Sequence, residues 1–154
     1  MRRALPLLFV ALILSACGGD GIKKRIFPPS ASIQELAVQT DGSWLLKVRL
    51  QNFSNVSMRF DSIDAELTFG PASAGRITLA TAVDVGPESA EVAEVRIVPQ
   101  SAAANPIQNA LMRRRSVNYK LEGEIVSSLP RSRDDDFVFE SQLTAVPGLT
   151  GVLR

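Results

Sequence analysis

Side chains that could do covalent chemistry are scarce in this chain. Its 154 residues include a single cysteine, Cys17, and no histidine. Nucleophilic sites that pair cysteine or serine with histidine, and metal sites built on imidazole, are therefore excluded. Paired carboxylates remain possible for acid–base work, and the Cys17 thiol is the other candidate. Its surroundings in the sequence decide which chemistry we expect of it.

Cys17 directly follows a short apolar run. Arg2 and Arg3 precede the apolar segment 5–13, and a Leu-Ser-Ala tripeptide stands immediately before the cysteine. A basic start, an apolar run and small residues at the cleavage point are typical of a secretory signal. The run is shorter than the roughly 20 apolar residues that cross a bilayer. An ordinary signal peptide followed by a free cysteine is the alternative interpretation.

The Leu-Ser-Ala-Cys sequence resembles the lipobox of bacterial lipoproteins. This resemblance implies cleavage after residue 16 and acylation of Cys17, and we expect no cofactor or metal beyond this covalent lipid. Each buried methylene of an acyl chain contributes about 0.8 kcal/mol, so several chains hold a domain durably on a membrane. Gly18 stands where an Asp would signal retention at the inner membrane in many Gram-negative bacteria. The resemblance therefore favours the outer membrane, with the domain facing the periplasm.

The chain divides into a signal peptide (1–16), a lipidated tether (17–29) and one domain (30–154). The tether begins with a Gly-Gly-Asp-Gly sequence of flexible composition. Three basic residues and two prolines follow. The basic residues could contact anionic headgroups, at roughly 1 kcal/mol each, or could simply be solvated.

The overall charge is balanced, with 17 basic and 16 acidic residues. Loss of Arg2 and Arg3 with the signal peptide leaves the mature chain close to neutral. Such a chain has no strong field that would attract nucleic acid. We expect a monomer whose partners are the membrane and, as a further candidate, an envelope protein or lipid, with no nucleic acid.

From residue 30 onward, apolar residues recur at every second position, which predicts strands with one buried face. The clearest case is 44–51, in which four apolar side chains should line the core: Trp44, Leu46, Val48 and Leu50. The Asp41-Gly42 pair predicts a hairpin between this strand and the preceding one. Further strands are predicted within the ranges 63–69, 76–85, 92–97, 117–125 and 137–143.

Two segments between these strands are predicted to be connections. Residues 70–75 contain small residues but lack the lysine and helix start of a phosphate-binding loop, so we predict a turn. Residues 131–136 are predicted to be a charged connection. Three consecutive acids, Asp134 to Asp136, do not match the alternating ligand spacing of a calcium loop, so we interpret them as solvated.

One helix is predicted, with Asn105 as its cap and Pro106 at its first position. Arg113, Arg114 and Arg115 stand near its C-terminal end, where positive charge suits the helix dipole. These arginines are a candidate docking patch for lipid headgroups or an acidic partner. The alternative is a helix end whose charges lie in water.

About seven short strands separated by turn signals, with one short helix, predict an all-β fold, an antiparallel β-sandwich. The candidate site residues are therefore Cys17 for lipidation and the three arginines for docking. We predict no catalytic residues and no metal ligands.

The segment 30–144 resembles the late-embryogenesis-abundant type 2 proteins, also called the water-stress and hypersensitive-response (WHy) domain. The resemblance rests on a spaced pattern of strands and turns that includes Asn52 to Asn55, 63–69, Gly75, Pro99 and 119–123. The family usually has Asn-Pro-Asn where this chain has Asn-Phe-Ser, so the proline of that turn is missing. The resemblance implies a fibronectin type III-like or immunoglobulin-like sandwich with a short helix.

The same resemblance implies a part in protection against desiccation or related stress. We therefore expect a non-catalytic envelope lipoprotein that acts through weak contacts with proteins or membranes. Two alternatives remain open. One is a lipid-binding or envelope-transport module that takes an acyl chain between its two sheets, and the other is a structural subunit of an envelope complex.

Overall fold

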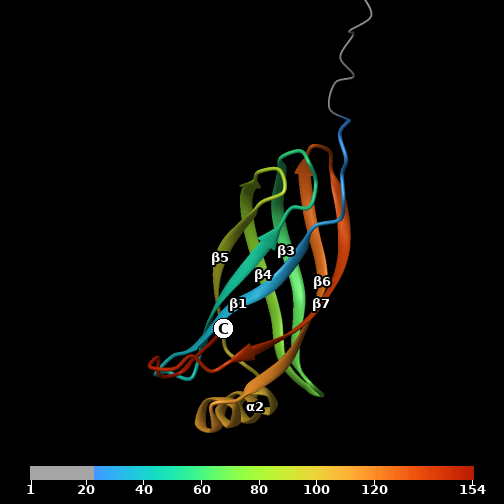
Figure 1. Ribbon diagram of the computed structural model, residues 1–154. Coiled ribbons are helices and arrows are strands. Elements are labelled where there is room, and N and C mark those ends of the chain that lie inside the picture. Colours follow the sequence, from blue (N-terminus) through green and yellow to red (C-terminus); the bar gives the residue numbers. More distant parts are fainter. Residues whose placement is uncertain (1–22) are drawn as a thin grey trace, which may run out of the picture.

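The computed structural model describes residues 23–154, so Cys17 and the predicted signal peptide lie outside the described residues. Two antiparallel sheets of four strands each pack face to face (Figure 1), which confirms the predicted β-sandwich. The elements are β1 (Ser30–Val38), β2 (Trp44–Gln51), β3 (Met58–Phe69), β4 (Ala72–Val85), β5 (Ala90–Ile97), α2 (Ser101–Arg113), β6 (Ser116–Leu129), β7 (Arg133–Thr144) and β8 (Val152–Leu153).

The first sheet has the strand order β5-β2-β1-β8. Its centre is the predicted hairpin, with Val38 opposite Trp44 and Ser30 opposite Gln51. The pairing register shifts between Ile33 and Glu35. This irregularity lets both Ile33 and Leu36 face the core although they are three positions apart in the chain.

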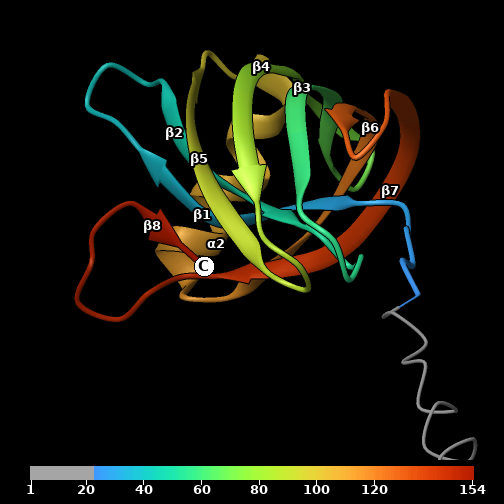
Figure 2. The same ribbon diagram turned by 90° about the horizontal axis from the view of Figure 1, so that it is seen from above.

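The second sheet has the order β4-β3-β6-β7 and contains the longest strands of the molecule. Seen from above, the two sheets cross at an angle (Figure 2). Gly123 of β6 lies directly opposite Ala65 of β3. A Cβ atom at residue 123 would meet the backbone oxygen of Asp64 at 2.1 Å, so only glycine allows this close approach of the strands.

Inward side chains of both sheets fill the space between them. The four residues predicted to face inward from β2 are at most 2% exposed. The largest fully buried side chains come from both sheets and from α2, and include Leu46, Phe60, Leu67, Ile107 and Leu121. The alternation predicted from the sequence therefore places these residues correctly, because period-2 patterns identify the buried face of a strand.

Two predicted connections are parts of strands, so those predictions were wrong. Ala72 to Gly75 belong to β4, and the turn is confined to Gly70 and Pro71. Gly75 has a φ of 115° at a register shift, so this glycine accommodates an irregularity within the strand and does not end it. Residues 133–136 likewise belong to β7.

The acidic run of β7 is also not uniformly solvated. Asp134 and Asp136 are exposed, but Asp135 is only 7% exposed and forms an ion pair with Arg133. Strand alternation explains the difference, because it turns every second residue of the run toward the interior.

The helix begins four residues before the predicted cap. Its N-cap is Gln100, which makes no side-chain capping bond, and Pro106 lies inside the helix. Ala103, Ile107 and Ala110 form the buried face. Burial of the Ala103 side chain and the high helix propensity of the alanines before Pro106 outweigh the loss of one backbone donor at the proline.

The C-terminal residues form a strand that the sequence pattern did not predict. β8 pairs with β1 through Leu153 and Val152, and Leu153 is fully buried. Among residues 23–154, no helix has the length and apolar character that crossing a bilayer would require.

Candidate functional site

The two ends of the sandwich differ in the segments they carry (Figure 1). We call one end the tether end; it comprises residues 23–29 and the turns 52–57, 86–89 and 130–132. We call the other the helix end; it comprises α2, the hairpin turn 39–43 and the loop 145–151. The start of β3, opposite Val85 and Leu129, lies at the tether end, whereas its last residue pairs with Ala72 near the helix end.

Arg113, Arg114 and Arg115 lie at the helix end, where α2 terminates. Arg114 is the C-cap, in the left-handed conformation with φ 51° and ψ 47°. The backbone N–H of Arg115 donates to the carbonyl of Ala110 at 2.9 Å, which completes the helix end. All three side chains are exposed and, within residues 23–154, none forms an ion pair.

The turn at Arg114 divides the three arginines between two cavities. Arg113 and Arg115 line a depression of about 280 Å³ that also includes Pro106 and Val117. Arg114 lines a larger groove of about 790 Å³. The structure therefore brings Arg113 and Arg115 together but separates Arg114 from them.

The larger groove lies between the end of α2 and the loop 145–151, and the sequence analysis did not identify it. Its apolar lining includes Leu111, Met112, Val146 and Leu149. Met112 is 75% exposed and Leu149 is 48% exposed. Contact of such large apolar side chains with water is unfavourable, so a group of them on one surface is notable. With Arg114 also lining it, the groove has the chemistry of a site for an anionic amphiphile or an acidic, partly apolar peptide.

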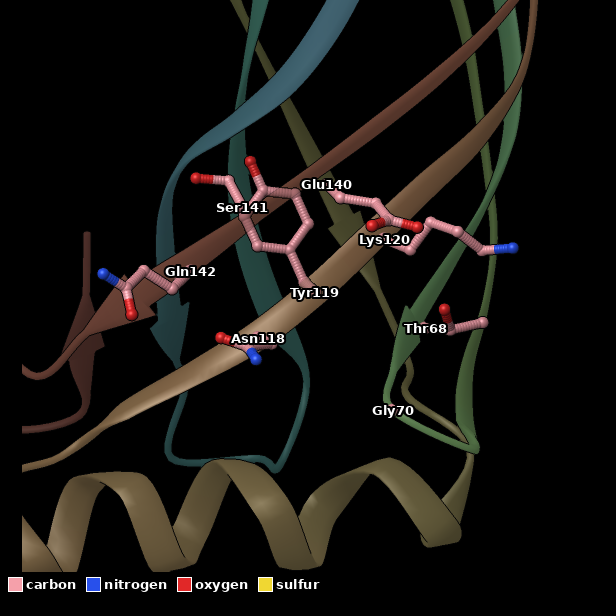
Figure 3. A pocket seen from close by; sticks show the side chains of 8 residues that line it. All are labelled: Thr68, Gly70, Asn118, Tyr119, Lys120, Glu140, Ser141 and Gln142. Atoms are coloured by element: carbon pink, nitrogen blue, oxygen red, sulfur yellow. The ribbon is translucent and has the colours of Figure 1, made fainter.

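A third open cavity, of about 600 Å³, lies near the start of β6 and the end of β7 (Figure 3). Its lining is largely polar and includes Asn118, Lys120, Glu140 and Gln142. The hydrogen bond that Lys120 donates to Glu122 raises the pKa of the Lys120 ammonium group. Most of these groups belong to the charged outer face of the sheet, and we assign them no ligand.

At the tether end, residues 23–29 are held by the turn that follows β2. The backbone N–H of Arg25 donates to Oδ1 of Asn55 at 2.6 Å, and Nδ2 of Asn55 donates to the carbonyl of Lys23 at 2.9 Å. The N–H of Phe27 donates to Oγ of Ser54 at 2.9 Å. The second half of the predicted tether is therefore attached to the sandwich surface.

The turn itself is fixed by Asn52, whose side chain is fully buried. Its Nδ2 donates to the carbonyls of Val56 and Gly86, each at 2.8 Å, and its Oδ1 accepts the N–H of Ser54 at 2.8 Å. This asparagine therefore joins the turns 52–57 and 86–89. Phe53, which replaces the proline usual at this position in the resembling family, is 51% exposed.

The interior carries two polar atoms without a partner within residues 23–154, one of them in the acidic run 134–136. Oγ of Ser127 and Oδ2 of Asp135 are buried and have no hydrogen-bond partner among the described residues. Within residues 23–154, no group of three or more acidic, cysteine or histidine residues is arranged to hold a metal ion.

No protein-family model matches the sequence, and no curated protein matches it either. Solved structures do. A solution structure from Arabidopsis thaliana is 12% identical, with a TM-score of 0.50 over 79% of this chain and 80% of that one. The two chains share a fold. At this identity the similarity concerns the fold alone.

Two other solved structures are also similar to this chain. One, described as a late embryogenesis abundant protein, is 13% identical, with a TM-score of 0.48 over 94% of this chain and 79% of the other. The second is from Archaeoglobus fulgidus, with 13% identity and a TM-score of 0.43 over 79% of this chain and 98% of the other.

Proposed function

We propose that this chain is a late-embryogenesis-abundant type 2-like domain of the cell envelope, held on the outer membrane by lipid on Cys17. It limits damage during desiccation or related stress through weak contacts with proteins or membranes. The resemblance in the sequence supports the assignment, and the fold shared with the Arabidopsis protein agrees with the sandwich that this resemblance implies. Because 45% of the residues are hydrophobic and the sandwich is packed, these contacts come from a folded surface.

The proposed anchor also has a consequence for the orientation of the domain. Residues 23–29 are attached at the tether end, and the arginines with the apolar groove lie at the helix end (Figure 1). A lipid on Cys17 would hold the tether end near the membrane. The helix end, with Arg113 to Arg115, would then face the periplasm and be free to meet partners.

The types of residue in the chain support a non-catalytic role. The chain has no histidine, and the proposal commits its single cysteine to the anchor. The charged side chains of the strands mainly pair with one another, as Arg59 does with Asp84 and Arg76 with Asp64. Such pairs are typical of a solvated sheet face.

Metabolic labelling with a palmitate analogue tests the anchor. The wild-type chain should incorporate the label and fractionate with the outer membrane, whereas Cys17→Ser should not incorporate it. Failure of the wild type to incorporate the label would overturn the lipoprotein assignment.

A deletion strain tests the stress role. After drying and rehydration it should recover less well than its parent, and wild-type protein supplied from a plasmid should restore recovery. Equal recovery of the two strains would contradict the role in desiccation.

A lipid-binding role is the second candidate, favoured by the groove at the helix end. An acyl chain cannot lie between the two sheets, because the inward side chains fill that space. The groove of about 790 Å³ has a volume typical of ligand sites, and its exposed Met112 and Leu149 suit an acyl chain. Mass spectrometry of the natively purified protein should then detect bound lipid, and Leu149→Glu should abolish it while Val138→Glu, on an exposed strand position, should not.

The arginines can be tested separately as a docking patch. Reversing all three, Arg113→Glu, Arg114→Glu and Arg115→Glu, should weaken association with an acidic partner protein. If the variant folds and its association is unchanged, the three charges are only a solvated helix end.

A further inference from the structure

Large apolar side chains are exposed at the tether end. Phe27 is 48% exposed, Phe53 51% and Leu129 52%. They come from three separate segments: the chain before β1, the turn after β2 and the last residue of β6. Burial of side chains of this size is normally favourable, so three of them at one end of a small domain indicate a surface that is covered in use.

Contacts in the structure place these segments together. Ser54, the neighbour of Phe53, accepts the N–H of Phe27, and its carbonyl accepts the N–H of Glu88 at 2.9 Å. Leu129 lies opposite Arg59, one residue after the start of β3. Figure 1 shows the turns at the same end from which residues 23–29 leave the sandwich.

Basic side chains occupy the same end. Lys23, Lys24, Arg25 and Arg131 are exposed and, within the described residues, form no ion pair. Glu88 is the exposed acidic residue of these segments, and the exposed Glu91 and Asp134 lie two residues beyond them, so the positive charge is concentrated in residues 23–25. Apolar side chains surrounded by lysine and arginine suit the interface of a membrane with anionic lipids.

The position of Cys17 identifies what covers this surface. Six peptide units separate Cys17 from Lys23, and even a fully extended chain of that length reaches only about 20 Å. Acyl chains on Cys17 therefore keep the tether end within that distance of the bilayer. The helix end is separated from it by the length of β3, whose 12 residues extend about 40 Å.

We propose that the tether end is a membrane-docking surface, in which Phe27, Phe53 and Leu129 enter the bilayer interface and the four basic residues contact anionic headgroups. The proposal rests on the lipidation of Cys17 in the proposed function. Docking fixes the orientation of the sandwich, so that the helix end points away from the membrane.

The test uses the full lipoprotein, purified in detergent and reconstituted into phosphatidylcholine vesicles with or without phosphatidylglycerol. A Phe53→Cys variant receives an environment-sensitive fluorophore, and because acylation consumes the thiol of Cys17 the introduced cysteine is labelled alone. Met112→Cys, at an exposed residue of the helix end, is the matched control. Fluorescence of Trp44, the single tryptophan of the chain, reports that each variant is folded.

With phosphatidylglycerol present, the label at residue 53 should be shielded from aqueous iodide and quenched by brominated lipid, and the label at residue 112 should be neither. Replacing Lys23, Lys24 and Arg25 by Gln should lower the ratio of docked to undocked protein by about a hundredfold, from about fivefold for each basic residue near an anionic surface. The same replacement of Arg113, Arg114 and Arg115 should leave that ratio unchanged.

Two results would overturn the docking surface: equal exposure of both labels to iodide, or equal effects of the two triple replacements. The mass of the purified protein is read first, because it reports the acyl chains on Cys17. Protein without acyl chains overturns the anchor of the proposed function. Acylated protein whose residue 53 remains exposed overturns only the docking surface and leaves the anchor in place.

Discussion

At the scale of single residues, Asn52 holds the tether end together. Its amide satisfies backbone groups of two turns while it is itself completely buried. Asn52→Ala leaves those carbonyls without a donor, so the free energy of unfolding should fall by about 3 kcal/mol. Urea unfolding followed by Trp44 fluorescence measures this change.

Asn55 supplies the matched control for this substitution. Its hydrogen bonds to Lys23 and Arg25 are exposed to solvent, so Asn55→Ala should lower the free energy of unfolding by less than about 1 kcal/mol. Equal effects of the two substitutions would show that burial of Asn52 is not what stabilises the turn.

Tyr119 connects the two sheets by a single hydroxyl. The backbone N–H of Ile33 donates to it at 3.0 Å, and the hydroxyl donates to the carbonyl of Ile33 at 3.3 Å, where the register of β1 shifts. Tyr119→Phe leaves the N–H of Ile33 buried without a partner and should cost about 1 to 3 kcal/mol. Thermal unfolding by circular dichroism measures the loss, and an unchanged midpoint would contradict this role.

Burial also raises the pKa of the Tyr119 hydroxyl, against a smaller opposing effect of the hydrogen bond with Ile33. The folded protein therefore holds this proton more tightly than the unfolded chain does. The stability contributed by Tyr119 should be complete below pH 10 and decline as the pH rises further. Tyr119→Phe should remove that part of the alkaline decline.

Glu35 provides stability with the opposite dependence on pH. Hydrogen bonds from Arg154 and then from Lys47 lower the pKa of its carboxyl below the usual 4.5. The folded state thus favours the charged form, and the resulting stability is present above pH 4.5 and lost as the pH falls through the folded pKa. Unfolding midpoints of wild type and Glu35→Gln should therefore converge in acid and diverge at neutral pH.

The exposed Glu91 of β5 is the control for this measurement, because it forms no ion pair within residues 23–154. Glu91→Gln should leave the pH profile unchanged. A Glu35→Gln profile parallel to that of the wild type would rule out the ion pairs as its cause.

At the scale of elements, the start of α2 allows a sharp comparison. Ala103 is fully buried and Ala102 is exposed, although both lie in the first turn. Ala103→Asp buries a charge between the helix and the sandwich, so it should lower the free energy of unfolding by about 3 kcal/mol or more. Ala102→Asp adds an acid near the helix N-terminus in water and should be neutral or slightly stabilising. A helix that began at Asn105 would tolerate both substitutions equally in urea unfolding.

The sequence pattern predicted the strands better than their ends. Alternation identified the inward residues of β2 because a single period-2 face is buried there. The same pattern missed Ala72 to Gly75, because small residues followed by a glycine are typical of a turn and the sequence does not show that Gly75 adopts a positive φ within a strand. β8 contributes only Val152 and Leu153, too few residues to show a period.

The candidate site was predictable only in part. The three arginines are adjacent in the sequence, but the left-handed C-cap at Arg114 separates their side chains. This backbone conformation could not be predicted from the residue types. The groove beside them is lined by α2 and by the loop 145–151, which are more than thirty residues apart in the sequence. Such contacts depend on tertiary packing and leave no local periodicity.

At the scale of the whole molecule, the two sheets share one hydrophobic core. Trp44 of the first sheet meets Phe69 of the second edge to face, with ring centroids 5.8 Å apart. Fluorescence of the single tryptophan therefore reports contact between the sheets, while far-ultraviolet circular dichroism reports the strands of both. If the core is one cooperative unit, the two signals should change together in urea.

A substitution in the second sheet tests this unity. Leu67 of β3 is fully buried, and Leu67→Ala should lower the free energy of unfolding by about 2 to 5 kcal/mol through the cavity it leaves. Because β3 belongs to the second sheet, a shared core requires that the Trp44 transition shift to lower urea together with the circular dichroism transition. Separate midpoints would mean that the sheets unfold independently. Coincident midpoints would mean that the two sheets unfold as one cooperative unit.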